Sequence, residues 1–212
     1  MSILERLASS LGRADEQPNV ELAAELAARA DKAAISELAK ALTAGPKPIR
    51  HDAIKALYEI GALRPDLIVA HAGAFLELAK GKDNRLIWGA LSALDAVAVA
   101  APDVVAANLP AILDAADRSS VIAKDKAVSM LARLAAQPKP SRVAWDRLIA
   151  ILRTAADNQT PMYAEMALSS AAANDPAELA EVVKFRLSSM DQPAKKARLE
   201  KVLRRLEKLA KA

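Results

Sequence analysis

A repeat with a constant period of 37 residues constrains this sequence more than any other feature. Alanine recurs at that interval at Ala53, Ala90, Ala127 and Ala164. A leucine follows each alanine four residues later, at Leu57, Leu94, Leu131 and Leu168, so that each pair shares one helical face. A third apolar set, again in step, consists of Leu38, Phe75, Ile112 and Ile149. Three interleaved sets in one register indicate stacked copies of one small unit.

Each unit is predicted to contain two helices joined by a short polar or proline-containing turn. Four of the first helices are predicted to begin with a proline. At the first position of a helix the N–H has no intrahelical partner, so its absence from proline breaks no hydrogen bond. The first helices are expected at residues 33–44, 65–79, 102–116, 140–156 and 176–190. The second helices are expected at 48–61, 83–101, 119–137, 160–174 and 194–211. Two further helices, at 2–12 and 19–30, are expected to precede the regular units.

Composition agrees with an all-α fold and argues against several kinds of chemistry. Alanine supplies 50 of the 212 residues and aromatic residues only 3%, which favours helices over strands. The absence of cysteine excludes disulfides, thiol catalysis and cysteine-based zinc sites, and two histidines argue against a histidine-rich metal site. The chain also contains no HExxH, Gly-rich phosphate loop or GxSxG motif. We therefore predict a protein that is not an enzyme and that uses no cofactor and no metal.

The pattern of the units resembles that of the HEAT and armadillo repeat families. A basic residue lies three positions before the core alanine in Arg50-x-x-Ala53 and Lys124-x-x-Ala127, whereas Ile87 and Pro161 replace it in the other two units. The resemblance covers roughly residues 33–211 and implies a right-handed α-solenoid of about five helix pairs, with the second helices on its concave face. We expect one domain over residues 1–212. That domain would comprise N-terminal capping helices at 1–32, HEAT-like repeats at 33–192 and a basic C-terminal capping helix at 193–212.

The resemblance implies binding of macromolecules rather than catalysis. Our first hypothesis is a scaffold that binds a protein or peptide along its second helices. A nucleic-acid-binding solenoid that uses the basic C-terminal helix ranks second, and a HEAT-like DNA glycosylase ranks third. The most apolar stretch, residues 86–101, carries Asp95 and is too short for a membrane span, and the first residues lack the apolar segment of a signal peptide. We therefore expect a cytoplasmic protein with no membrane span.

Positive charge is concentrated near the end of the sequence. Residues 184–212 contain ten Lys or Arg against three Asp or Glu, whereas the rest of the chain carries a net charge of −3. This segment fits either a solubilising helix at the end of a stack or a surface for phosphates or an acidic partner. The candidate binding residues are the basic residues of the second helices, namely Arg50, Lys55, Lys124, Lys126, Arg133, Arg198, Arg204, Arg205 and Lys208.

Other conspicuous side chains are given structural interpretations. Trp88 and Trp145 are expected to pack in the core, and His51 and His71 to be ordinary surface or half-buried histidines. Two carboxylates of one helix, Asp52 and Glu59, are expected on its solvated side. The register further predicts that the repeated alanines are buried between layers.

Overall fold

The computed structural model of the chain describes residues 2–138 and 141–210, which contain twelve α-helices and no strand. By its internal contacts the chain forms two compact units. The first extends to Ala127 and the second begins at Val128. The division falls within α8 (Val121–Ala135). None of the helices in the described part is long and apolar enough to cross a membrane.

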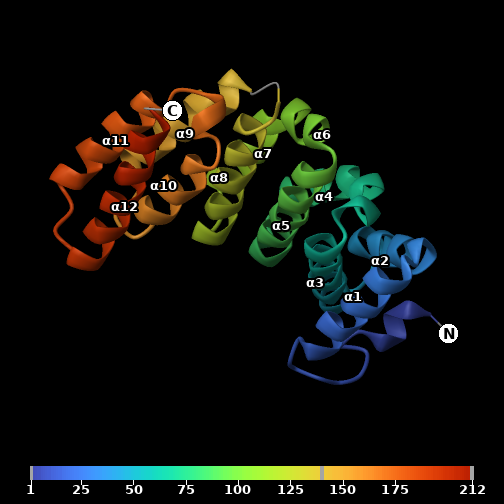
Figure 1. The fold of residues 1–212 in the computed structure, drawn as a ribbon. Coiled ribbons are helices and arrows are strands. Elements are labelled where there is room, and N and C mark those ends of the chain that lie inside the picture. The colour runs from blue at the N-terminus through green and yellow to red at the C-terminus, as the bar shows by residue number, and fades with distance from the viewer. Residues whose placement is uncertain (1, 139–140, 211–212) are drawn as a thin grey trace. The chain divides into compact units, whose positions relative to one another are not determined.

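The first unit consists of two layers of helices. The helices α1 (Gln17–Arg29), α3 (Lys47–Leu63) and α5 (Asn84–Ala100) pack side by side in that order (Figure 1). The helices α2 (Lys32–Ala44), α4 (Ala72–Ala79) and α7 (Leu109–Asp117) form the other layer. The connecting elements are η1 (Ile3–Arg6), η2 (Pro65–Leu67), η3 (Val69–His71) and α6 (Pro102–Ala107). Each regular pair thus places its second helix in the α1–α3–α5 layer.

The second unit repeats this pairing with fewer helices. The helices α9 (Arg142–Thr154) and α11 (Pro176–Ser188) pack against each other, and α10 (Thr160–Leu168) packs against α12 (Pro193–Leu209). A short η4 (Ala171–Ala173) follows α10. Side-chain caps fix the starts of α9 and α11, because Ser141 accepts a hydrogen bond from the Ala144 N–H and Asp175 accepts one from the Ala177 N–H.

The repeated apolar positions form the core, as the register predicts. Ala90 is fully buried and Ala127 is 2% exposed. The third set is also buried, at Leu38, Phe75, Ile112 and Ile149. Of the leucine set only Leu168 is half-exposed, on a surface that α10 shares with α12. Small residues in these positions allow the helices to approach closely: a Cβ added to Gly89 of α5 would lie 2.8 Å from Ile54 Cγ1 of α3.

The structure corrects several expected helices. Residues 2–12 contain only the short η1 followed by turns, with Gly12 at a φ of 68°. The expected helix 65–79 begins as η2 and η3 and becomes α-helical at Ala72. The helix 102–116 is interrupted at Asn108, since Pro110 in the first turn of α7 has no N–H to continue α6. The helix 160–174 ends at Leu168 and resumes as η4. The start predicted at residue 140 lies outside the described residues, which resume at Ser141.

Candidate binding surfaces

A cluster of aromatic and charged side chains joins α3 to α5 in the first unit. The Tyr58 and Trp88 rings lie with their centroids 5.6 Å apart at an interplanar angle of 50°. Lys55 Nζ lies 4.9 Å from the centroid of the Tyr58 ring, within cation–π range. Tyr58 and Trp88 are both half-exposed. Trp88 is therefore not part of the core, contrary to expectation, whereas Trp145 is fully buried as predicted.

Ion pairs hold this cluster in one geometry. Glu16, directly before α1, pairs with Arg85 through one carboxylate oxygen and with Lys55 Nζ at 3.3 Å through the other. Lys55 also pairs with Glu59 at 2.6 Å. Burial lowers the pKa of Lys55, but its hydrogen bonds with Glu59 and Tyr58 outweigh burial, so its pKa is raised overall. We call Glu16, Lys55, Tyr58, Arg85 and Trp88 the α3–α5 patch.

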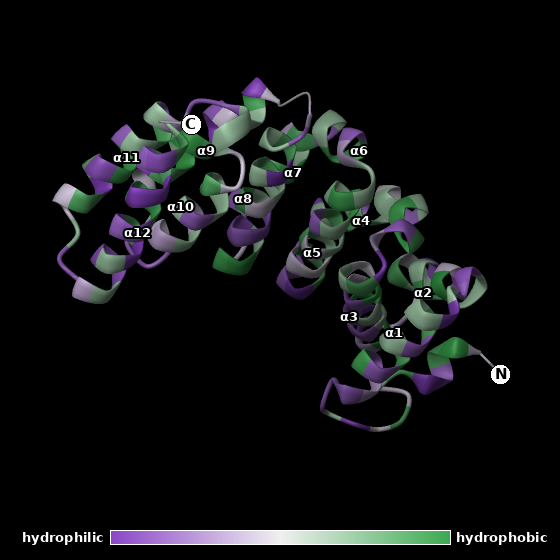
Figure 2. Ribbon diagram, viewed as in Figure 1, coloured by the Kyte–Doolittle hydropathy of each residue, from purple (hydrophilic) through white to green (hydrophobic). Residues whose placement is uncertain are grey.

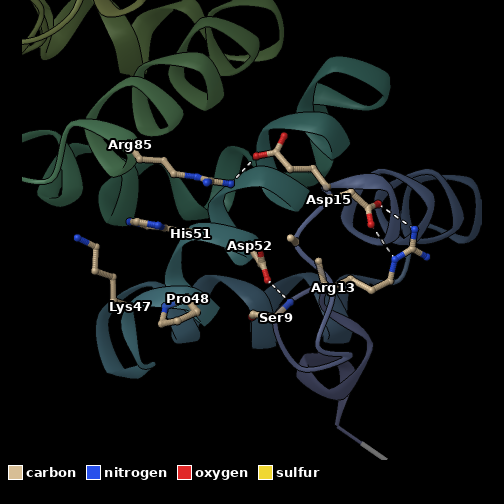
Figure 3. Close-up of a pocket in the computed structure, with 11 residues that line it drawn as sticks. Ser9, Arg13, Asp15, Lys47, Pro48, His51, Asp52 and Arg85 are labelled. Atoms are coloured by element: carbon tan, nitrogen blue, oxygen red, sulfur yellow. Dashed lines mark hydrogen bonds and ion pairs between the residues drawn. The ribbon is translucent and has the colours of Figure 1, made fainter.

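A cleft of about 300 Å³ lies beside this patch, between the N-terminal segment and the starts of α3 and α5. Figure 3 shows Lys47, His51 and Arg85 on one side of the cleft and Arg13 paired with Asp15 on the other. Each of the three strong cations has a carboxylate partner. Arg13 pairs with Asp15, Arg85 with Glu16, and Lys47 with Asp83 at 3.3 Å. The positive charges of the cleft are therefore neutralised by carboxylates in or next to it.

Asp52 lies at the base of this cleft and fastens the N-terminal segment to α3. Its carboxylate accepts a hydrogen bond from the Ser9 N–H at 2.7 Å (Figure 3). It accepts a second hydrogen bond from Asn19 Nδ2 at 2.8 Å. The residue is 7% exposed, so the expectation that Asp52 is solvated is wrong. A buried carboxylate needs such donors, because a buried charge without partners is costly. Glu59, the other carboxylate expected on the solvated side of this helix, is half-exposed and pairs with Lys55.

The two histidines take the structural roles expected for them. His51 Nε2 lies 2.9 Å from Asp83 Oδ2, the carboxylate that also caps the start of α5. His71 ends η3 and is half-buried, and burial lowers its pKa. Among the described residues no group of three or more His, Asp or Glu side chains could hold a metal ion.

A groove lies between α10 and α12 in the second unit. It consists of two adjoining hollows of about 280 and 380 Å³ that share Leu168 and Arg205. Apolar side chains form its floor, and basic side chains of α12 form its rim. Figure 2 shows α12 largely in the hydrophilic colour. The lining residues are Glu165, Leu168, Ala172, Arg198, Lys201, Val202, Arg205, Lys208 and Leu209. We call this the α10–α12 groove.

Three of the four basic residues predicted for the first unit have structural partners of their own. Arg50 Nε donates to the Leu42 carbonyl at 2.7 Å and so ties α3 to the end of α2. Lys55 belongs to the α3–α5 patch, and Lys126 pairs with Asp95 at 3.7 Å. Lys124 is exposed on α8. Arg50 and Lys55 therefore contribute to structure, and their part in binding remains a prediction.

In the second unit, the predicted residues separate into those that line the groove and those that do not. Arg198, Arg205 and Lys208 line it, whereas Arg204 is exposed elsewhere on α12. Arg133 is exposed on α8. Sequence reasoning missed Lys201, although its position three residues after Arg198 places both on one helical face. Binding by these side chains also remains a prediction.

Comparisons with known proteins support the repeat fold. No family model and no curated protein matches the chain. Among solved structures, an engineered protein is 19% identical with a TM-score of 0.59, over 99% of this chain and 98% of that chain. A designed armadillo repeat protein in complex with the peptide (KR)4 is 16% identical with a TM-score of 0.65, over 89% of this chain and 85% of that chain.

A chain from a crystal structure of computationally designed armadillo repeat proteins for modular peptide recognition is 17% identical with a TM-score of 0.62, over 96% of this chain and 98% of that chain. These likenesses show the fold alone. The chain is an all-α solenoid of helix pairs with the fold of armadillo repeat proteins, as the sequence repeat predicts.

Proposed function

We propose that this protein is a non-enzymatic scaffold that binds a protein or peptide partner, and that the α3–α5 patch is its principal contact surface. The observation that carries the proposal is the half-exposed pair Tyr58 and Trp88, flanked by Arg85. Tyrosine, tryptophan and arginine dominate the binding energy of protein interfaces. Similar solved structures include armadillo repeat proteins designed for peptide recognition, which supports the same interpretation.

The geometry of the patch favours recognition because its side chains are already held in place. Glu16 bridges Lys55 and Arg85, and Lys55 contacts the Tyr58 ring. A partner would therefore meet side chains that lose little conformational freedom on binding, and such losses are a main cost of association. The aromatic rings provide apolar contact area, and the surrounding charges would fix the orientation of the bound partner.

Selection of peptides from a displayed random library against the full chain tests this proposal. We expect enriched peptides whose affinity falls by about tenfold or more in Trp88→Ala, as for a residue that dominates an interface. Lys40→Ala, an exposed change on α2 in the other helical layer, is the matched control and should change affinity by less than about twofold. Failure to enrich any peptide, or equal binding by Trp88→Ala and the parent chain, would refute the proposal.

A further inference from the structure

Four cations follow one flank of α12 along the α10–α12 groove. They are Arg198, Lys201, Arg205 and Lys208, and all are exposed. Their spacings of three, four and three residues keep them on one helical face. At 1.5 Å per residue the row extends over about 15 Å. The row therefore matches the length of a short peptide segment rather than a single small anion.

Among the described residues, Arg198 alone of these four cations forms an ion pair with a carboxylate. Arg198 forms a two-pronged pair with Glu165, with Nε–Oε1 and Nη2–Oε2 distances of 2.9 and 2.6 Å, and this contact lowers the pKa of Glu165. No ion pair joins Lys201, Arg205 or Lys208 to a carboxylate of the described residues, although the charge of Lys201 also contributes to the lowered pKa of Glu165. The groove lining contains four cations and one carboxylate, and Glu165 is already engaged.

The floor beneath this row is apolar. Leu168 of α10 is half-exposed, and Leu209 of α12 is 38% exposed, while Val202, which lines the first hollow, is buried. Ala172 widens the second hollow because its side chain is small. A half-exposed and an exposed leucine lie beside a row of four cations, of which only Arg198 is ion-paired, and such a surface is complementary to an acidic amphipathic ligand.

The remaining charges of α12 lie off the groove. Glu200, Arg204 and Glu207 are exposed and do not line either hollow. The two acidic residues of the helix are thus kept away from the cationic row. Arg204 has the same charge and a similar exposure as Arg205, but a different direction on the helix, which makes it a matched control.

We infer that the α10–α12 groove binds an acidic amphipathic peptide segment of a partner protein. Its carboxylates would pair with Lys201, Arg205 and Lys208, and its apolar side chains would cover Leu168 and Leu209. The apolar floor favours a peptide over a nucleic acid, because a phosphate backbone gains nothing from it and the groove lining offers no aromatic ring on which a base could stack. A basic peptide would be repelled by the row. This inference goes beyond the proposed function, since it assigns a second surface and a ligand charge that the α3–α5 patch does not determine.

Titration of the full chain with a labelled synthetic helix tests the inference. The probe is an amidated peptide of about 15 residues made of Glu, Leu and Ala, with Glu and Leu on adjoining helical faces, which spans about 22 Å. At about 0.15 M salt we expect saturable binding by fluorescence anisotropy. Arg205→Glu should weaken it by about tenfold or more, because a like charge then faces the peptide. Arg204→Glu should change the affinity by less than about twofold.

Two further probes make the outcome specific. The same peptide with Leu replaced by Ala should bind at least about tenfold more weakly, because it cannot cover the apolar floor. Trp88→Ala should leave binding of the Glu–Leu probe unchanged, which separates this groove from the α3–α5 patch. Absence of binding, equal losses in Arg204→Glu and Arg205→Glu, or tighter Arg205-dependent binding of a single-stranded oligonucleotide than of the peptide would each overturn the inference.

Discussion

The two units are built from the same helix pairs but carry opposite net charges. The first contains 15 Lys or Arg and 17 Asp or Glu, a net charge of −2. The second contains 15 Lys or Arg and nine Asp or Glu, a net charge of +6. Both units bury their repeated apolar positions, with the exception of Leu168, so the fold leaves the surface charge free to differ.

The difference shows most clearly on the second helices. Lys47, Lys55 and Arg85 of the first unit each pair with a carboxylate, so that the surface neutralises itself. Lys201 and Arg205 of the second unit have no such partner among the described residues. A surface whose charges are paired with one another selects a partner by shape and aromatic contact. A surface whose cations have no ion-pair partners selects it by charge. One chain can thus present two kinds of binding surface on one architecture.

The largest expected effect tests whether the second unit has an independent core. Trp145 is fully buried in α9, and its Nε1 donates to Glu178 at 2.6 Å. Trp145→Ala should lower the free energy of unfolding by about 3–5 kcal/mol, measured by denaturant unfolding. Trp145→Phe keeps most of the packing and should lose less. Hydrogen exchange should report the lost protection chiefly at residues 141–210, and uniform loss along the chain would contradict two separate cores.

A smaller effect is expected from the close contact between α3 and α5 in the first unit. Gly89→Val adds a side chain where Ile54 already lies within 2.8 Å of the position that the new Cβ would occupy, and it should cost about 1–3 kcal/mol through overpacking. Gly73→Ala in α4 is the control, because no atom lies within 4 Å of its added Cβ, and it should change stability by less than about 1 kcal/mol. Equal midpoints for the two variants would show that α3 and α5 are not tightly packed.

The ion pairs of the first unit should also give it an acid-sensitive component. Burial raises the pKa of the Asp83 carboxyl, but hydrogen bonds from His51, Lys47 and the Leu86 N–H outweigh burial and bring its pKa to about 2. A lowered carboxyl pKa stabilises the folded state above the ordinary value of 3.8, and this contribution is lost as the pH falls toward 2. Allowing for its partial exposure, we expect about 1 kcal/mol.

Asp83→Asn isolates this component, because asparagine can still cap α5 but cannot titrate. The variant should be less stable than the parent chain at neutral pH and should lose less stability between pH 5 and pH 2 in urea unfolding curves. Parallel pH profiles for the two chains would show that the pairs with His51 and Lys47 do not stabilise the fold.

The core could be predicted from the sequence because a fixed period and a helical spacing together determine which side chains face inward. Phe75 and Ile112 illustrate this, since both are buried although each lies in a helix whose bounds were mispredicted. The positions at which the predicted helices are interrupted depend on local backbone chemistry, such as the missing N–H of Pro110. Such a feature of one unit is not visible in a pattern shared by all the units.

The binding surfaces were predicted less completely, because they depend on contacts between helices. Tyr58 and Trp88 meet although they are 30 positions apart, which does not match the 37-residue period, so no register indicates their contact. Asp52 is buried by a segment expected to be a helix of its own. Arg205 and Lys208 could be named from their sequence, but the groove beside them exists only because Leu168 and Ala172 lie opposite.

The smallest expected effect is the most direct test of the comparison between the units. Replacing Arg198, Arg204, Arg205 and Lys208 together by Gln removes four positive charges and brings the formal net charge from +4 to 0. The free energy of unfolding should nevertheless change by less than about 0.5 kcal/mol, because exposed charges contribute little to stability. A single change in the first unit, Lys55→Gln, should cost more, about 1 kcal/mol, because this side chain is 13% exposed and its loss leaves Glu59 unpaired.

The two results together show whether the cations of α12 form a binding surface or hold α12 against α10. If the fourfold variant unfolds at the midpoint of the parent chain while Lys55→Gln does not, the cations of the first unit stabilise the fold and those of α12 remain available to a partner. A loss of more than about 2 kcal/mol in the fourfold variant, beyond what exposed charges contribute, would mean that α12 depends on these cations to pack against α10. The α10–α12 groove would then be part of the helix interface, and its positive charge would need no ligand to explain it.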